Sequence, residues 1–196
     1  MDVTFFIQAG VAVTIVLVLA FVVRQSGKAS QNTRTQRDEV AERRAKKRAL
    51  LARKVIKVDW RDEFAIDGGG VIDRDHQMLF RLINQFSANV PRFRLPREMA
   101  PYLDTLKKYT QAHFAREEKM QAAVNFLAQE EHKQEHAAMI GKLDEVIAKA
   151  RKATDDTVND VAYEISQFLI KDWLAKHVLE SDLSMRAYVE RVKKRA

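Results

Sequence analysis

The chain has 196 residues, with 34 Lys and Arg against 27 Asp and Glu, giving a net charge of +7. It contains no Cys, which excludes a disulfide scaffold, a thiolate zinc site and a cysteine nucleophile. Only six Gly and three Pro occur among many Ala, Leu, Glu, Lys and Arg, a composition that favours a mostly helical protein.

The chain begins with a long apolar stretch. Residues 3–23, VTFFIQAGVAVTIVLVLAFVV, carry no charged side chain. At about 1.5 Å per residue, a helix of this length spans about 30 Å, the thickness of the hydrocarbon core of a bilayer. A cleaved signal peptide is the alternative, but such a segment has a basic start and a shorter apolar run. We therefore expect residues 1–23 to form a transmembrane anchor.

A strongly basic segment follows this stretch. Residues 24–57 hold twelve Lys and Arg against three acids, whereas residues 58–196 are close to neutral. Because cytoplasmic flanks carry the positive excess, we expect a single-pass protein of the cytoplasmic (inner) membrane with its C-terminal domain facing the cytoplasm. Residues 24–57 would form a juxtamembrane linker near anionic lipid headgroups. No nucleic acid is expected as a partner, since the segment lacks interleaved aromatic residues and any recognisable binding module.

Residues 58–196 show helical periodicity in four amphipathic segments and a short tail. Three glycines, 68–70, indicate a loop, and Asp73 is expected to cap the first helix at its N-terminus. The expected helices run over about 72–90, 96–124, 127–152, 157–179 and 183–195. The short connections predict an all-α, antiparallel up-and-down four-helix bundle, preceded by the transmembrane helix and the basic helical linker.

The inward stripes of these helices carry all the histidines of the chain. These residues are His76, His113, His132, His136 and His177, and Glu117 shares their stripe. Asp182 lies five residues after His177, or 140° around an ideal helix, so it can turn inward only if the helix ends or bends there. A single core histidine is usually a satisfied hydrogen-bonding group, but five histidines with two acids indicate a metal site. Iron suits this donor set, and zinc or manganese suits it less specifically.

As a set, these residues resemble the hemerythrins, and in particular the bacterial hemerythrin-like proteins. The resemblance covers roughly residues 58–185 and rests on Trp60 and on IDRDH, HFAREE, HKQEH and WLAKHVLESD. It implies a cofactor of two iron ions in a non-haem di-iron site. One iron would be held by His132, His136 and His177, and the other by His76 and His113. Glu117, Asp182 and an oxo or hydroxo group would bridge the two irons.

The resemblance also implies a function, reversible O₂ binding at the open position of the two-histidine iron. The protein would store O₂ or deliver it at the membrane to a respiratory or oxygenase complex, without being an enzyme. Reversible binding requires a dry pocket, for which Trp173 and Leu174 are candidates. For Phe114 and Leu79, simple core packing is an equal alternative. Two other functions stay open: a membrane-tethered O₂ or redox sensor acting through residues 24–57, and a di-iron enzyme that reduces peroxide or nitric oxide.

Overall fold

A computed structural model describes the backbone of residues 3–195 and the side chains of residues 24–25 and 31–195. The described backbone is helical and contains no strand, so the predicted all-α class is confirmed. The chain divides into two compact units, Met1–Lys47 and Arg48–Ala196. The division into three domains at residues 23 and 57 stays a prediction.

The N-terminal part of the chain is one long helix, α1 (Val3–Lys54), of 52 residues. Within the first unit, the side chains of residues 31–46 are all exposed. Charged and polar side chains occur throughout this segment, with no run of apolar residues between them. α1 therefore continues directly from the apolar stretch into the charged one, without the break that a separate anchor and linker would allow.

The expected membrane localisation is wrong. Among the residues that the structure describes, none of the helices combines the length and the apolar character needed to cross a membrane. The charged side chains of the described part of α1 give the physical reason, since ionised groups are too costly in hydrocarbon. The side chains of residues 3–23, on which the anchor depended, lie outside the described residues. Two further expectations depended on this localisation and are not supported. They are the contact of residues 24–57 with lipid and the contact of the chain with a membrane complex.

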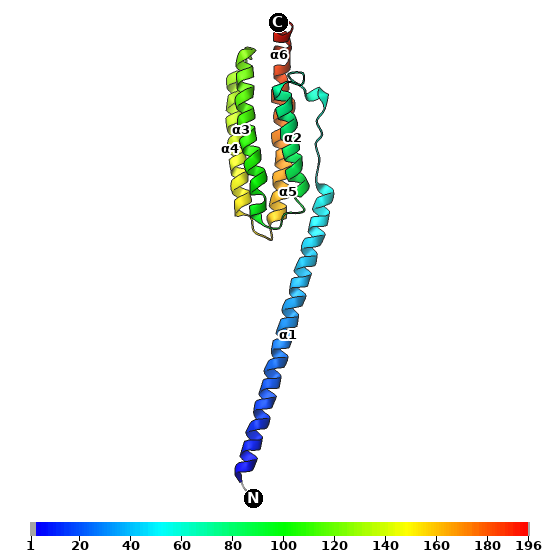
Figure 1. Ribbon diagram of the computed structural model, residues 1–196, viewed down its shortest axis with the longest axis vertical. Helices are drawn as coiled ribbons and strands as arrows, with labels where there is room; N and C mark the ends of the chain where they lie inside the picture. The colour runs from blue at the N-terminus through cyan, green and yellow to red at the C-terminus, as the bar shows by residue number, and fades with distance from the viewer. Residues whose placement is uncertain (1–2, 196) are drawn as a thin grey trace. The chain divides into compact units, whose positions relative to one another are not determined.

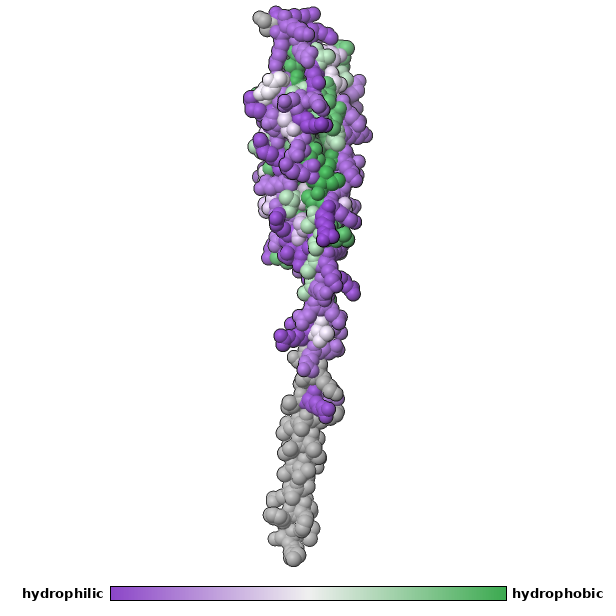
Figure 2. Space-filling model, turned by 90° about the vertical axis from the view of Figure 1, so that its right-hand side faces the viewer, coloured by the Kyte–Doolittle hydropathy of each residue, from purple (hydrophilic) through white to green (hydrophobic). Residues whose placement is uncertain are grey.

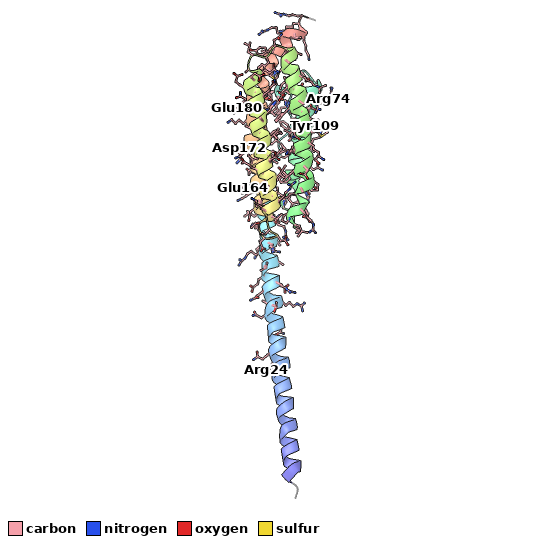
Figure 3. The ribbon with its side chains drawn as sticks, turned by 90° about the vertical axis from the view of Figure 1, so that its left-hand side faces the viewer. Arg24, Arg74, Tyr109, Glu164, Asp172 and Glu180 are labelled. Carbon is pink, nitrogen blue, oxygen red and sulfur yellow. The ribbon has the colours of Figure 1, made fainter. Side chains whose placement is uncertain are left out.

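The second unit is a helical bundle. Its α-helices are α2 (Val71–Asn89), α3 (Ala100–Ala123), α4 (Gln129–Lys152), α5 (Val158–Phe168) and α6 (Arg186–Lys193). Its shorter helices are η1 (Asp62–Phe64), η2 (Pro96–Glu98), the π-helices η3 (Leu169–Ala175) and η4 (His177–Ser181), and η5 (Asp182–Met185). Figure 1 shows α2, α3, α4 and α5 side by side, each running back along its predecessor. Glu164, Asp172 and Glu180, labelled in Figure 3, follow one another along α5 and its π-helical continuation.

Two hydrophobic cores fill the bundle. The larger core, which includes Leu79, Phe86, Leu106, Leu143 and Ile165, is built by α2, α3, α4 and α5. A smaller core contains Ile66, Ile72, Phe126, Met185 and Val189. Along α2, His76 lies between Ile72 of the small core and Leu79 of the large one, and the other helices repeat this order. The histidines therefore occupy a polar layer with an apolar core on each side.

The loop before α2 is closed by two aspartates. Asp73 lies in the first turn of α2 and not at its N-cap, which is Gly70, so the expected capping role is corrected. Asp67 accepts hydrogen bonds from the backbone N–H groups of Ile72 and Asp73, and this satisfies the free donors of the helix start. Asp73 in turn accepts three N–H groups from the loop. A Cβ atom on Gly70 would collide with the carboxylate of Asp67, which explains a glycine there.

An extended segment after α1 lies along α2. The side-chain amide of Asn84 accepts from the N–H of Val58 at 2.9 Å and donates to its C=O at 2.7 Å. Beyond this clamp, the ring of Trp60 lies 5.7 Å from that of Phe80 and 6.3 Å from that of His76. Figure 2 looks onto this side of the bundle and shows apolar residues gathered among charged ones. The segment thus covers the outer side of His76 with an aromatic ring.

Candidate metal centre

All seven predicted ligands converge in the polar layer of the bundle. Each is buried, with a fractional exposure of 5 % or less. Four parts of the bundle supply them: α2 gives His76, α3 gives His113 and Glu117, α4 gives His132 and His136, and the η4–η5 segment gives His177 and Asp182. Spacings of four residues on α3 and α4 place both members of each pair on one helix face. The HFAREE motif therefore points His113 and Glu117 into the bundle.

The seven side chains form two groups that share their acids. In each group, one candidate ligand atom per residue lies within 4.8 Å of all the others. The first group joins three histidines with both acids, and the second joins two histidines with the same acids. The members are Glu117, His132, His136, His177 and Asp182 in the first group, and His76, His113, Glu117 and Asp182 in the second.

Asp182 faces both groups with different oxygens. Its Oδ2 lies 3.1 Å from Nε2 of His76. Its Oδ1 lies 3.1 Å from Nε2 of His177 and 3.2 Å from Nε2 of His132. A carboxylate whose two oxygens serve two sets of imidazoles has the arrangement of a bridging ligand.

Glu117 also reaches both groups. Its Oε2 lies 3.3 Å from Nε2 of His113 and 3.5 Å from Nε2 of His136. Its Oε1 is 3.9 Å from Nε2 of His132. Each of the five histidines thus turns its Nε2 atom toward at least one of the two shared carboxylates.

The donor atoms of this layer have no hydrogen-bond partner among the described residues. This holds for both carboxylate oxygens of Glu117 and Asp182 and for the Nε2 atoms of all five histidines. The nearest N···O pairs are 3.1 to 3.9 Å apart, but none has hydrogen-bond alignment. Leaving so many buried polar groups unpaired is costly, at about 1–3 kcal/mol each. Metal ions between the two groups would satisfy them, so the residues fit a binuclear metal site.

The π-helices explain how His177 and Asp182 meet. The expectation was that the helix ends or bends before Asp182. Instead, η4 (His177–Ser181) widens the turn and makes i→i+5 hydrogen bonds. In such a turn, residues five apart lie nearly above one another, so His177 and Asp182 face the same way. π-Helical turns are frequent at functional sites.

Burial and the shared acids shift the pKa values of the histidines in opposite directions. Burial lowers the pKa of His76, but nearby Asp182 and Glu117 outweigh it and raise the pKa above 6.5. His177 follows the same pattern, with Asp182 as the largest opposing cause. For His113, burial prevails over Asp75 and Glu117 and lowers the pKa. Burial raises the pKa of Asp182, but His177, His132 and His76 hold it well below 3.8.

Three further acids hold the histidines from outside, and sequence reasoning missed them. Oε1 of Glu118 lies 2.9 Å from Nδ1 of His136. Oε1 of Glu135 lies 3.0 Å from Nδ1 of His177, and this bond lowers the pKa of Glu135 to about 2 against the cost of burial.

Asp75 is the third of these acids. Its Oδ2 lies 3.6 Å from Nδ1 of His113. With Glu118 and Glu135 it forms a set in which each carboxylate faces the outer nitrogen of one histidine. An outer partner of this kind fixes the ring orientation and the tautomer of a ligating histidine.

The four expected pocket residues lie in or beside the large core. The rings of Phe114 and Trp173 are 6.3 Å apart, and Phe114 stacks on His136 with centroids 3.7 Å apart. Leu79 and Leu174 are each 1 % exposed. Phe114 lines a surface depression of about 280 Å³ that also touches His136, and Trp173 lines another of the same volume that touches His177. Apolar groups therefore border the histidine layer, and the role of these four as an O₂ pocket stays a prediction.

Comparison with known proteins gives a consistent picture. The family described as Hemerythrin HHE cation binding domain matches residues 67–188. The chain is 28% identical over 134 residues to the bacteriohemerythrin of Clostridium acetobutylicum, covering 67% of this chain and 98% of the relative. It is 31% identical over 127 residues to the myohemerythrin of Riftia pachyptila, covering 65% and 89% respectively. A hemerythrin-like protein of Naegleria gruberi is 30% identical over 128 residues, covering 65% and 90%.

Proposed function

Because the chain belongs to the hemerythrin family, we propose that it binds O₂ reversibly at a non-haem di-iron site in residues 58–196. In this proposal the helical bundle is the antiparallel up-and-down four-helix bundle of the hemerythrins. The similarity to a bacteriohemerythrin and a myohemerythrin supports this assignment. The protein stores or delivers O₂ and does not convert it.

The proposed ligand set follows the two groups of the polar layer. His132, His136 and His177 hold one iron, and His76 and His113 hold the other. Glu117 and Asp182, which face both groups, would hold both ions. Imidazole and carboxylate donors of this kind suit iron.

The two groups differ by one histidine, and this asymmetry provides the place for O₂. When bound, the two irons supply the two electrons that reversible O₂ binding requires. The group with two histidines offers one ligand fewer than the group with three and would leave room for O₂ there. The chain's own residues orient the site, because Glu118 and Glu135 fix the outer nitrogens of His136 and His177.

The apolar border of the site serves reversibility. Trp173, Leu174, Phe114 and Leu79 limit access of water to the histidine layer. Exclusion of water slows irreversible oxidation, because side reactions of a bound ligand need proton transfer from solvent. The burial of these four side chains, each 4 % exposed or less, supports this role.

One observation carries the proposal. Two groups of buried histidines share two buried carboxylates, and within the described part of the chain the donor atoms that face one another have no hydrogen-bond partner. Structural histidines in a core have no reason to leave five Nε2 atoms unpaired around two acids. A binuclear site accounts for the charge, the burial and the orientation of all seven side chains at once.

The test is made on the full chain. The iron content is measured after anaerobic loading, and absorption spectra are recorded before and after exposure to O₂ and again after deoxygenation. We expect about two irons per chain and a visible band that appears with O₂, disappears on its removal and returns. Iron with rapid, irreversible oxidation would refute reversible binding, and zinc alone or no metal would refute the di-iron site.

Two variants tie the spectrum to the proposed site. His113→Ala removes one of the two histidines at the open half and should abolish the O₂-dependent band. Asp104→Asn changes an exposed acid on the same helix, 3.7 Å from Arg151, and should leave the band unchanged. A band that survives His113→Ala would place O₂ elsewhere.

A further inference from the structure

Asp75 is the most heavily tethered acid next to the metal centre. It lies on α2 beside His76, but its side chain is bound by residues of α3. The hydroxyl of Tyr109 donates to Oδ1 of Asp75 at 2.7 Å, and Nε of Arg116 donates to Oδ2 at 2.6 Å. Tyr109, labelled in Figure 3, lies on α3 one turn before His113. The guanidinium of Arg116 also lies over the ring of Tyr109, 5.8 Å from its centre.

These bonds aim the carboxylate at the outer side of His113. Oδ2 of Asp75, the oxygen that Arg116 holds, lies 3.6 Å from Nδ1 of His113. On the inner side, Nε2 of the same ring faces Glu117 at 3.3 Å. The imidazole is thus enclosed between an outer and an inner carboxylate. A small rotation of the ring would bring its Nδ1–H within hydrogen-bond distance of Asp75.

Asp75 differs from the two other outer acids. The side chains of Glu118 and Glu135 are 31% and 35% exposed, and each contacts its histidine directly. The side chain of Asp75 is only 8% exposed. Burial of a carboxylate is costly without compensation, and here Arg116 and Tyr109 provide it. Burial tends to raise the pKa of Asp75, but the nearby His113 and the bonds from Arg116 and Tyr109 hold it far below 3.8.

We propose that Asp75, fixed by Tyr109 and Arg116, is a positioning residue that orients His113 and sets the metal affinity of the two-histidine half. The inference rests on the proposed function, because it takes His76 and His113 as ligands of one metal. It assigns an outer carboxylate to the half of the site that is proposed to bind O₂. His113 is the ligand of that half that faces an outer carboxylate, since its Nδ1 lies 3.6 Å from Asp75, whereas the contact of His76 with an acid is made by its inner Nε2 atom.

The experiment is an anaerobic Co²⁺ titration of the metal-free full chain, followed by visible absorption and by metal analysis. The wild type should bind two Co²⁺ per chain. Asp75→Ala should weaken the second Co²⁺ by a factor on the order of 10 to 100, the usual effect of removing an outer partner of a ligating histidine. The first Co²⁺, in the three-histidine half, should keep its affinity and spectrum. Equal affinity for the second Co²⁺ in variant and wild type would overturn the inference.

Two further observations separate positioning from structural support. Tyr109→Phe removes one of the two bonds that fix Asp75 but leaves the carboxylate and Arg116, so it should weaken the second Co²⁺ by less than Asp75→Ala does and leave the first Co²⁺ unchanged. If both Co²⁺ ions weakened together in either variant, Asp75 would be merely structural and the inference wrong. Asp144→Ala, which removes the exposed ion pair with Lys107 of α3, should change nothing.

Two other outcomes also test the proposals: an Asp75→Ala chain that does not fold, and a wild-type chain that binds fewer than two Co²⁺. If Asp75→Ala does not fold, Asp75→Asn keeps the volume but has one acceptor oxygen in place of two. It should also weaken the second Co²⁺, and unchanged binding would overturn the inference. A wild-type chain that takes up fewer than two Co²⁺ would refute the proposed binuclear site itself.

Discussion

Replacing Glu117 with Gln should have opposite effects on the stability of the metal-free and of the metal-loaded protein. Glu117 is fully buried, and neither of its oxygens has a hydrogen-bond partner among the described residues. Glutamine keeps the shape but removes a buried negative charge, whose desolvation is costly. The metal-free variant should therefore be at least as stable as the wild type. With metal the order should reverse, because an amide is a poor bridging ligand.

The magnitude follows from linkage between metal binding and folding. Metal at 100 times its dissociation constant stabilises the folded state by about 2.7 kcal/mol per site. A change of 1 kcal/mol shifts the melting temperature of a chain of this size by about 2–4 °C. One occupied site should thus raise the melting temperature by roughly 5–11 °C, and a second site should add to it. Glu117 faces histidines of both groups, so Glu117→Gln should lose most of this gain.

The assay is thermal unfolding, followed by circular dichroism, of wild type and Glu117→Gln with EDTA and with anaerobic Fe²⁺. Asp104→Asn, an exposed acid on the same helix, serves as the matched control and should respond to Fe²⁺ like the wild type. An equal Fe²⁺-dependent shift in Glu117→Gln and the wild type would refute the reasoning that this carboxylate belongs to the metal site. A metal-free variant much less stable than the wild type would refute the claim that its charge is a burden without metal.

Three further predictions concern the frame around the site. Burial and the bond to Asp75 raise the pKa of Tyr109 from 10 to about 12. The stability that the neutral hydroxyl contributes to the fold is therefore complete below pH 10 and is lost between pH 10 and 12. The stability of Tyr109→Phe should depend less on pH in this range, as measured by unfolding experiments. Asn84→Ala removes both bonds to Val58 and should cost about 1–3 kcal/mol in urea unfolding, and an unchanged midpoint would contradict the clamp. Phe114→Ala empties a buried ring position and should cost about 3–5 kcal/mol, measured in the same way on metal-free protein.

The order and type of the helices were predictable because apolar residues recur with helical spacing. The predicted start at residue 127 falls within two residues of Gln129, whereas the start after an Asp73 cap was too late, since α2 begins at Val71. The start at residue 96 was too early, since η2 (Pro96–Glu98) precedes α3 and a chain turn separates them. The helix expected over 157–179 changes to π-helix after Phe168. Periodicity could not predict this change, because it follows from the need to face His177 and Asp182 inward together.

The candidate ligands were predictable for a different reason. Charged and polar side chains rarely lie on an apolar stripe, so His113 and Glu117 in one turn were conspicuous. The same holds for His132 and His136. The membrane anchor rested on residues 3–23, whose side chains lie outside the described ones, and none of the described helices is long and apolar enough to support it.

The outer acids could not be recognised as a group, although their placement follows a rule. Asp75, Glu118 and Glu135 each adjoin a candidate ligand in the sequence, and among other charges they look like solvated surface residues. A residue next to an inward one is rotated by about 100° around the helix, so it points to the boundary with a neighbouring helix. There each acid meets a histidine of the next helix in the chain. Asp75 of α2 faces α3, Glu118 of α3 faces α4, and Glu135 of α4 faces η4.

The same rule explains why His76 is held differently. If this pattern continued from the last helical segment back to the first, an acid next to His177 would face His76 of α2. The neighbours of His177 are instead Lys176 and Val178. Neither can accept a hydrogen bond from His76 with its side chain. The ring of Trp60 lies 6.3 Å from that of His76 instead, and the clamp between Val58 and Asn84 holds the segment that carries it. Glu118 and Glu135 therefore orient His136 and His177, and Asp75 faces His113, whereas His76 is confined by packing from a segment outside the four helices.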